Sequence, residues 1–534
     1  MVSLSPASLL AALLSAALLS AALLSAGGLA VGGLAVGGLA VGRAAFAGNR
    51  PVTVRRLSPM ARAQPDTPTA AVGPLLQVVG AGLGVPCLDG IERPYVDLDC
   101  AASTPSSVAV AAAVDDFLPR YSSVHRGAGF KSRAATEAYE TARSRALRYA
   151  GREGGADTAI ICRNTTEALN HLAYRLRLER DDVVLTTVLE HHANLLPWAR
   201  YARRRYVECG SDGTFSVDDV EAGLDATPAP KVLAVTGASN VTGWLPPVEE
   251  LCAAARARGI PVVLDAAQLA AHRPIPGGDG GAERPDFVAW SGHKMYAPFG
   301  AGVLVGPAAA FADGEPFLAG GGAVELVDLD EVLWSAPPER EEAGSPNVVG
   351  AVALGAAADE LSGIGWEAIS RHEAVLADRL RRSLAAFDGV RLLGPPAGTE
   401  TLAVATFTVE GMHHGLVAAR LATEFGIGVR HGCFCAHPYL LRLLGIGPDG
   451  VAAARAEALR GDRRHIPGAV RASAGLGTTL GDVDALLDAL SVVVSGTPPP
   501  VDYVQDAATG DFFPATTAGW WAPSSGVGGG CARN

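Results

Sequence analysis

The chain has 534 residues, of which 49% are hydrophobic and 18% charged, a balance too apolar for wholesale disorder. Its 43 Lys and Arg residues against 55 Asp and Glu residues leave a net charge of −12, so we expect no nucleic-acid partner. The eight cysteines are scattered rather than set in a dense framework, which predicts reduced thiols and a cytoplasmic protein.

Residues 1–60 form a low-complexity apolar extension. The first 42 carry no charge and repeat ALLSA and then GGLAV. Three interpretations stay open: a disordered extension or mis-set start with Met60 as the true start, a cleaved signal, or a membrane anchor. No basic segment precedes the apolar run, and its second half is rich in glycine, a poor composition for a spanning helix, so we do not expect a membrane partner.

Residues 111–362 alternate short β-branched runs with helical periods, which predicts βα units and an α/β fold with a large domain around a mainly parallel sheet. Ser132 is expected to cap a helix that Gly151 stops, and a further helix is expected over 247–259. The expected strands are 158–163, 182–187, 231–237, 260–266, 286–292 and 300–306.

Residues 363–495 have a different character and predict a smaller C-terminal α+β domain. The expected elements are a long helix over 365–387, strands over 402–410 and 426–434, and a last helix after Gly481. Residues 61–110 are expected to contribute to this domain and to the site. Residues 496–534 are rich in glycine, proline and aromatic residues without a helical period, which predicts a tail on the surface.

Polar residues follow two of the expected strands. Asp265 comes directly after four apolar residues, with Gln268 three residues later, and the next strand runs into Ser291, His293 and Lys294. Open α/β sheets bind ligands at the carboxyl ends of their strands. A lysine in this position suits a Schiff base, and an aspartate suits the protonated ring nitrogen of pyridoxal 5′-phosphate.

Three more segments would complete a cofactor site. Thr165 and Thr166 follow a strand and begin a helix, where free amides favour a phosphate. His191 and His192 follow the next strand, and one of them would stack on a pyridine ring, while the amide of Asn240 would bond the phenolic oxygen. Each segment alone is more often an ordinary helix cap, a solvent-facing histidine or a turn, but their order after successive strands favours a site.

The segments EHHANLLPW, ASNVTG, VVLDAAQ, WSGHKMYAPFGAG and EAGSPN resemble the class V aminotransferase family, most closely its SUF-type cysteine desulfurases and selenocysteine lyases. The resemblance covers about residues 90–492 and implies a fold type I homodimer dependent on pyridoxal phosphate. It implies a Schiff base at Lys294, a ring-nitrogen partner in Asp265, a phenolic-oxygen partner in Gln268 and a stacking ring in His191. It implies phosphate contacts from Thr166, Ser291 and His293, and from Ser345 of the other subunit.

The segment VRHGCFCAHPYL indicates which reaction the cofactor would support. The resemblance aligns Cys435 with the desulfurase nucleophile, and Arg430 would favour its thiolate. One alternative is a small buried cysteine. Another is a metal site, since His431, Cys433, Cys435 and His437 would share one face of a strand, but one strand cannot wrap a tetrahedral ion with all four, and we expect no metal. The GCFC spelling also resembles molybdenum cofactor sulfurases, which usually carry a further C-terminal domain.

Three residues concern the substrate. The resemblance aligns Arg471 with an arginine that binds the α-carboxylate of an amino acid, where a bidentate fork fits a planar group. It aligns His125 and Arg126 with a segment that lines the substrate pocket. The chain departs from the family at Gly477 and Thr478, which affects the fine geometry of substrate binding.

These observations predict an enzyme that converts L-cysteine to L-alanine and moves sulfur to Cys435 as a persulfide, with a sulfur-acceptor protein as a possible partner. The alternatives are a class V aminotransferase, epimerase or lyase in which Cys435 is a bystander, and a molybdenum cofactor sulfurase. A non-catalytic binding protein on the same fold is opposed by the intact set of Lys294, Asp265 and Arg471.

Overall fold

The computed structural model describes residues 73–277, 281 and 283–516, all within one compact unit, Thr69–Asn534. The expectations for residues 1–60 therefore lie outside the described residues, as does the last part of the predicted tail, residues 517–534. Among the described helices, none alone is long and apolar enough to cross a bilayer. The helices α7 (Val348–Ile364) and α8 (Trp366–Ala385) pass such a test only together, bent by 83°.

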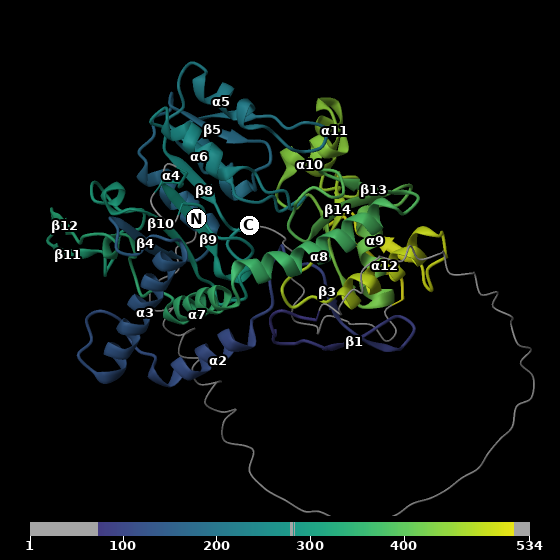
Figure 1. Ribbon diagram of the computed structural model, residues 1–534, viewed down its shortest axis with the longest axis horizontal. Coiled ribbons are helices and arrows are strands. Elements are labelled where there is room, and N and C mark those ends of the chain that lie inside the picture. The colour runs from purple at the N-terminus through teal and green to yellow at the C-terminus, as the bar shows by residue number, and fades with distance from the viewer. Residues whose placement is uncertain (1–72, 278–280, 282, 517–534) are drawn as a thin grey trace, which may run out of the picture. The chain divides into compact units, whose positions relative to one another are not determined.

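A seven-stranded sheet is the centre of the larger part of the molecule (Figure 1). Its order is β4-β10-β9-β8-β7-β5-β6, and β10 alone is antiparallel to its neighbours, so the sheet is mainly parallel as predicted. Its strands are β4 (Asp157–Cys162), β5 (Val183–Thr187), β6 (Arg203–Val207), β7 (Val232–Thr236), β8 (Val262–Asp265), β9 (Phe287–Ser291) and β10 (Gly302–Pro307).

Both faces of this sheet are buried. Val184 and Leu185 are consecutive in β5 but belong to different apolar clusters, and Val263 and Leu264 in β8 do the same. Successive side chains of a strand point to opposite faces, so a strand covered on both sides reads as a continuous apolar run. The covering helices are α2 (Val108–Phe117), α3 (Phe130–Tyr149), α4 (Thr165–Arg175), α5 (Val217–Asp225), α6 (Val248–Arg256) and α7 (Val348–Ile364).

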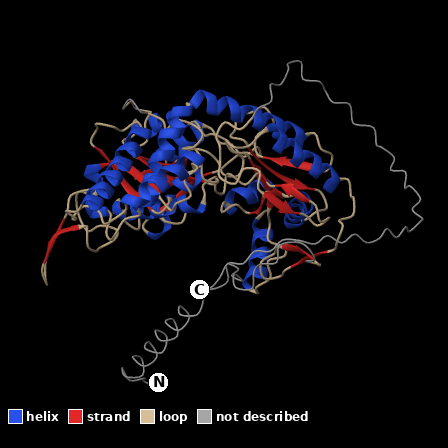
Figure 2. Ribbon diagram, turned by 90° about the horizontal axis from the view of Figure 1, so that it is seen from below, coloured by secondary structure: helices blue, strands red, loops and turns tan. Residues whose placement is uncertain are grey.

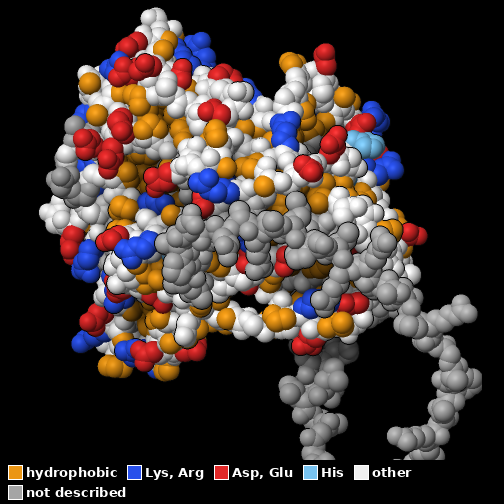
Figure 3. Space-filling model, turned by 45° about the vertical axis from the view of Figure 1, so that its right-hand side comes forward, with side chains coloured by type: hydrophobic (Ala, Val, Ile, Leu, Met, Phe, Trp, Pro, Cys, Tyr) orange, Lys and Arg blue, Asp and Glu red, His pale blue; other side chains and the backbone are white. Residues whose placement is uncertain are grey.

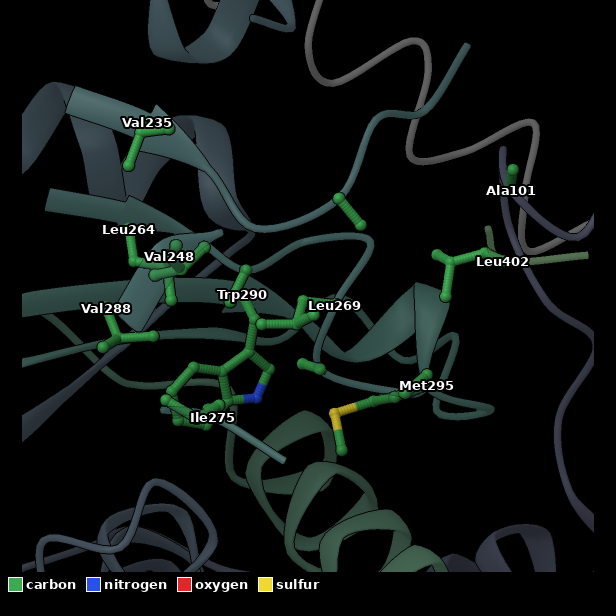
Figure 4. Close-up of a cluster of buried hydrophobic side chains, with 14 of the residues drawn as sticks. Ala101, Val235, Val248, Leu264, Leu269, Ile275, Val288, Trp290, Met295 and Leu402 are labelled. Atoms are coloured by element: carbon green, nitrogen blue, oxygen red, sulfur yellow. The ribbon is translucent and has the colours of Figure 1, made fainter. Parts of the chain in front are cut away.

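The core under one face anchors the segment that carries Lys294. Trp290 of β9 is fully buried, and Met295 is 1% exposed. Figure 4 shows both side chains in the same apolar cluster, with Leu269 and Ile275 close to Trp290. Because Trp290 and Met295 are fixed in this core, the residues between them are held at the end of the strand.

A second sheet of four strands, in the order β13-β14-β17-β16, forms the centre of the C-terminal part. Figure 2 shows the strands of both sheets with helices packed around them. The strands are β13 (Val390–Leu393), β14 (Val404–Val409), β16 (Arg430–Gly432) and β17 (Ala469–Ser473). The helices are α8 (Trp366–Ala385), α9 (His414–Phe425), α10 (His437–Leu444), α11 (Pro448–Leu459) and α12 (Leu480–Val494).

Four pairs of short strands lie outside the two large sheets. The N-terminal segment supplies a hairpin and a strand that pairs in parallel with the C-terminal part, and the described start of the predicted tail forms a hairpin as well. The pairs are β1 (Gly84–Pro86) with β2 (Glu92–Pro94), β3 (Val96–Asp97) with β15 (Ile427–Gly428), β11 (Val324–Val327) with β12 (Val332–Trp334), and β18 (Tyr503–Gln505) with β19 (Phe512–Pro514).

Two local predictions are wrong. Ser132 does not cap α3, because the helix already begins at Phe130 after Gly129, and the Ser132 hydroxyl donates instead to the Ser123 carbonyl. Residues 426–434 are not one strand: they form the short strands β15 and β16 and then enter a tight turn. His431, Cys433, Cys435 and His437 therefore do not share a strand face, and no group of metal ligands is found among the described residues.

The surface carries mixed charge. On the face shown in Figure 3, Lys and Arg side chains lie among Asp and Glu side chains rather than in a separate basic region. Such mixing gives no extended positive surface on this face for a phosphate backbone.

Candidate active site

A cavity of about 340 Å³ opens where the strands of the large sheet end. Every residue predicted for the site lines it except His125, Arg126 and Ser345. The predicted residues on its wall are Thr165, Thr166, His191, Asn240, Asp265, Gln268, Ser291, His293, Lys294, Arg430, Cys435 and Arg471.

Asp265 and Lys294 are two charged residues of opposite sign on the wall of this cavity. Asp265 is the last residue of β8, is 3% exposed, and accepts a hydrogen bond of 3.0 Å from the Ala267 amide. Burial raises the pKa of Asp265, against the opposing effects of the Ala267 amide and Lys294. Burial lowers the pKa of Lys294 to about 8, with Asp265 acting in the opposite direction. The Lys294 amine is therefore available as a nucleophile near neutral pH.

One corner of the cavity is built for an anion. The helix α4 begins at Thr165, capped by Asn164, whose Oδ1 accepts from the Glu167 amide at 2.9 Å. The Ser291 hydroxyl accepts from the Thr165 amide at 2.7 Å and lies 2.7 Å from Thr165 Oγ1. A helix N-terminus with two hydroxyls and the cavity-lining Thr166 suits a phosphate.

Gly302 allows strand β10 to pack closely against the residues at the start of α4. A Cβ at Gly302 of β10 would lie 2.6 Å from Asn164 Cα and 2.8 Å from the Trp290 carbonyl oxygen. The strand could not approach the start of α4 this closely with any larger residue.

The His191 ring is neutral across the physiological range. Burial, aided by the charge of Lys294, lowers the pKa of His191 to about 3. Its Nδ1 accepts a hydrogen bond from the Ala193 amide at 3.0 Å, so the ring proton is on Nε2. A neutral ring on the cavity wall suits stacking on another aromatic ring.

The two predicted amide side chains are already engaged with the protein. Gln268 Nε2 donates to the Ala101 carbonyl at 2.7 Å. Asn240 Nδ2 donates to the Phe434 carbonyl at 2.7 Å. Asn240 therefore links the large sheet to the segment that carries Cys435, a role that its sequence context did not indicate.

Arg471 and Arg430 share one carboxylate that sequence reasoning missed. Arg471 Nη2 lies 2.9 Å from Asp99 Oδ1, and Arg430 Nη2 lies 2.8 Å from Asp99 Oδ2. Arg471 is 2% exposed, and its Nε is buried without a hydrogen-bond partner. Arg471 Nη1 donates to the Asn240 carbonyl at 2.9 Å, and a guanidinium on the cavity wall suits the carboxylate of a ligand.

A second buried carboxyl lies behind the cavity and was also missed. Glu190 accepts hydrogen bonds from Thr187 Oγ1 at 2.8 Å, Asn194 Nδ2 at 2.7 Å and the Thr236 amide at 3.1 Å. Burial raises the pKa of Glu190 to about 8. The group ties together the ends of β5 and β7; its position directly before the His191–His192 pair was the available signal.

Cys435 is exposed at the cavity wall. It lies in a turn over Cys433–Ala436, closed by a 3.0 Å hydrogen bond from the Ala436 amide to the Cys433 carbonyl. We call these four residues the Cys435 turn. The cysteine is close enough to Lys294 for its charge to favour the protonated lysine.

Three predicted residues lie away from the cavity of this chain. His125 Nε2 lies 3.1 Å from Glu140 Oε1, and Arg126 Nη2 donates to the Val324 carbonyl at 3.0 Å. Ser345 is exposed in the loop before α7. These positions do not contribute to a site within one chain.

Comparison with known proteins matches residues 96–486 to the family model described as Aminotransferase class-V. A probable cysteine desulfurase of Halalkalibacterium halodurans is 36% identical over 372 residues, 68% of this chain and 88% of that protein. A cysteine desulfurase of Haloferax volcanii is 33% identical over 360 residues, 66% of this chain and 83% of that protein. The apo structure of a cysteine desulfurase from Thermococcus onnurineus NA1 superposes with a TM-score of 0.67 at 32% identity, covering 75% of this chain and 95% of that one.

Proposed function

The chain belongs to the class-V aminotransferase family, whose members are pyridoxal-phosphate enzymes of fold type I, and from this premise we propose that it is a cysteine desulfurase. It would convert L-cysteine to L-alanine and leave the sulfur on Cys435. The observation that carries the proposal is an exposed cysteine on the wall of the cavity that holds Lys294, Asp265 and a buried arginine.

The residues of the cavity fit the cofactor. Asp265 would pair with the ring nitrogen, and Lys294 would hold the aldehyde carbon. Thr165, Thr166 and Ser291 line the corner at the start of α4 and would hold the phosphate with His293. When bound, pyridoxal phosphate supplies an electron sink that stabilises negative charge at the substrate's α-carbon.

Arg471 would bind the α-carboxylate of the amino acid. Its place on the cavity wall supports this role, and Asp99 keeps the side chain in position through Nη2. Arg430, also held by Asp99, would add positive charge near the entrance. A small amino acid is therefore recognised through its carboxylate, while its side chain is directed toward Cys435.

Lys294 and Cys435 would carry the bond changes. As a free amine, Lys294 Nζ takes the proton from the substrate's α-carbon. The Cys435 thiolate attacks the substrate sulfur, so that a sulfur–sulfur bond forms while the carbon–sulfur bond breaks. The β-carbon then takes a proton in place of the sulfur, and the α-carbon regains a proton from Lys294 Nζ, which gives alanine and a persulfide on Cys435. The neutral His191 would stack on the ring and orient it.

The test is product analysis with purified protein, pyridoxal phosphate and L-cysteine. Wild type should form alanine and sulfide equivalents in equal amounts, and Cys435→Ala should form neither. Cys209→Ala is the matched control, since Cys209 is another partly exposed free cysteine and lies outside the cavity. An aminotransferase would instead form a keto acid and be indifferent to Cys435→Ala; that result would overturn the proposal.

We further propose a homodimer that completes the site. The hairpin β11–β12 exposes a group of large apolar side chains, and Arg126 is bonded to its first residue. Exposed apolar groups of this kind mark protein interfaces. His125, Arg126 and Ser345, which lie away from this chain's own cavity, would serve the partner's. The exposed hairpin residues are Leu326, Val327, Leu329, Val332 and Leu333.

Light scattering after size exclusion tests the dimer. The double change Leu326→Asp and Leu329→Asp should shift the mass toward the monomer and reduce turnover. Leu459→Asp on α11 is the control, because Leu459 is also an exposed leucine, at 80%. A monomeric wild type with full activity would contradict the proposal.

None of the seven described cysteines is in a disulfide, which supports a reducing compartment, and we propose the cytoplasm. A sulfur-acceptor protein would take the persulfide from the exposed Cys435.

A further inference from the structure

The Cys435 turn has a backbone conformation that ordinary residues avoid. Phe434 has φ of +54° and Cys435 has φ of +53°, both in the left-handed region. With the hydrogen bond from the Ala436 amide to the Cys433 carbonyl, this is the mirror-image turn that favours glycine or asparagine at both central positions. A phenylalanine and a cysteine occupy it here, so other contacts must hold the turn in this form.

Three contacts from outside the turn hold it. Asn240 Nδ2 donates to the Phe434 carbonyl at 2.7 Å, and the His192 amide donates to the Cys435 carbonyl at 2.8 Å. The Arg471 guanidinium lies 5.1 Å from the centre of the Phe434 ring. Both central peptide groups of the turn are thus fixed. This holds the backbone of Cys433 and that of Cys435 at a constant distance and orientation.

The first residue of the turn is a second free cysteine. Cys433 is partly exposed and packs against the apolar core, while Cys435 is exposed. The Cys435 backbone amide is close enough to the Cys433 sulfur to favour its thiolate, although burial raises the pKa of this thiol. Only Phe434 lies between the two cysteines, and its turn conformation keeps their Cα atoms within about 7 Å, the upper limit for cysteines that can form a disulfide. Two thiols are held on one turn, with a single residue between them.

We propose that Cys433 is a resolving thiol that discharges the persulfide of Cys435 and releases sulfide without an acceptor protein. This inference rests on the proposed function, since that activity forms the persulfide. The Cys433 thiolate attacks the Cys435 Sγ atom; a sulfur–sulfur bond forms between the two cysteines, and the bond from Sγ to the terminal sulfur breaks. The electron pair leaves with the terminal sulfur as hydrosulfide, so the step needs no external oxidant.

The geometry favours attack on Sγ over attack on the terminal sulfur. The Cys433 sulfur is close to the Cys435 backbone amide, and Sγ is the persulfide sulfur nearer to that backbone. Attack on the terminal sulfur would instead move the persulfide to the less exposed of the two cysteines. The enzyme that results is a Cys433–Cys435 disulfide, so a second turnover requires a thiol reductant.

The discharge should depend on pH. Burial raises the pKa of the Cys433 thiol, although the nearby Cys435 amide opposes this. The thiolate is therefore the minor form at neutral pH, and sulfide release in the absence of reductant should become faster as the pH rises.

The test is a single turnover of the holoenzyme with L-cysteine and no reductant, followed by an acid quench and trypsin digestion. Cleavage after Arg430 and Arg442 gives a peptide, residues 431–442, that contains these two cysteines and no other. In wild type, this peptide should be about 2 Da lighter than the dithiol, with one alanine and one free sulfide per site. In Cys433→Ser and Cys433→Ala, this peptide should be about 32 Da heavier than the same variant's unmodified peptide, because it carries the persulfide sulfur. One alanine and almost no free sulfide should form per site. Cys209→Ser should behave as wild type.

Two results distinguish a failure of the role proposed for Cys433 from a failure of the proposed desulfurase activity. A wild-type peptide that keeps the additional 32 Da or so, with alanine formed normally, overturns the role of Cys433 and leaves the desulfurase intact. If no variant forms alanine, the proposed function fails; inorganic polysulfide can then load the persulfide directly, and the same two masses decide the role of Cys433.

Discussion

The two ends of the cavity are constructed in different ways. At the cofactor end, Asp265 and Ser291 are the last residues of buried parallel strands, each 3% exposed, so that the sheet itself fixes them. At the sulfur end, Cys435 is exposed on a turn with positive φ, held by side chains that come from other parts of the chain. The sheet thus fixes the residues of the cofactor end, whereas a few specific tertiary contacts fix the sulfur end.

Replacement of the Schiff-base lysine should have the largest effect, because it should abolish both the covalent attachment of the cofactor and turnover. Lys294→Ala should abolish the visible absorbance of bound pyridoxal phosphate and reduce turnover by at least about 10³-fold, because nucleophile and base are lost together. Absorbance spectra and kcat measure both effects. Lys231→Ala, at an exposed lysine just before β7, should leave both unchanged. Retained absorbance in Lys294→Ala would contradict the assignment.

The arginine that faces the substrate should affect binding more than chemistry. Arg471→Gln should raise the KM for L-cysteine by roughly 10- to 100-fold, since a charge-assisted pair is worth about 1.5–3 kcal/mol. Bound-cofactor absorbance should persist. A change in kcat with an unchanged KM would show that Arg471 supports the Phe434 ring rather than the substrate.

The contact from Asn240 should distinguish the two ends. Asn240→Asp keeps the shape but replaces the donor to the Phe434 carbonyl with an acceptor, so the Cys435 turn should relax and kcat should fall about 30-fold, as expected for an unsatisfied group costing about 2 kcal/mol. If Asn240 served only the cofactor, as its sequence context suggested, the spectrum would change and the reaction of Cys435 with iodoacetamide would not. We expect faster alkylation of Cys435 and a nearly unchanged spectrum.

The smallest effect concerns pH. With a pKa of about 8, Lys294 is mostly protonated at pH 7 and mostly free at pH 9. The rate at which apoprotein takes up pyridoxal phosphate should therefore rise about ten-fold between these two values. Stopped-flow absorbance measures it. A rate independent of pH would indicate an amine that titrates outside this range.

The cofactor end could be predicted from the sequence because its signals are local. A run of apolar residues followed by Asp265, or by Ser291 and Lys294, encodes both the buried strand and the polar residue at its end. Both faces of β5 and β8 are covered, which explains why these strands read as nearly continuous apolar runs up to their polar ends. The mainly parallel sheet was predicted on this basis, and the family was predicted from the resemblance of its motifs; the domain boundaries and the roles of single residues stay predictions.

The sulfur end could not be predicted in the same way. The sequence of residues 426–434 resembles a strand, and β-branched residues there gave no sign of the turn at Phe434 and Cys435. That turn depends on Asn240 and His192, which are about 200 positions away in the chain. Asp99, which holds both arginines, was missed for the same reason. Tertiary contacts decide these positions against local preference.

The measurement that tests the separation of the two ends most directly is the absorbance spectrum of Cys435→Ala during addition of L-cysteine. We expect this variant to keep the bound-cofactor spectrum of wild type and to change it on addition of L-cysteine, yet to form no alanine. Loss of the bound-cofactor spectrum would show that Cys435 also serves the cofactor, and formation of alanine and sulfide at the wild-type rate would show that Cys435 does not take the sulfur.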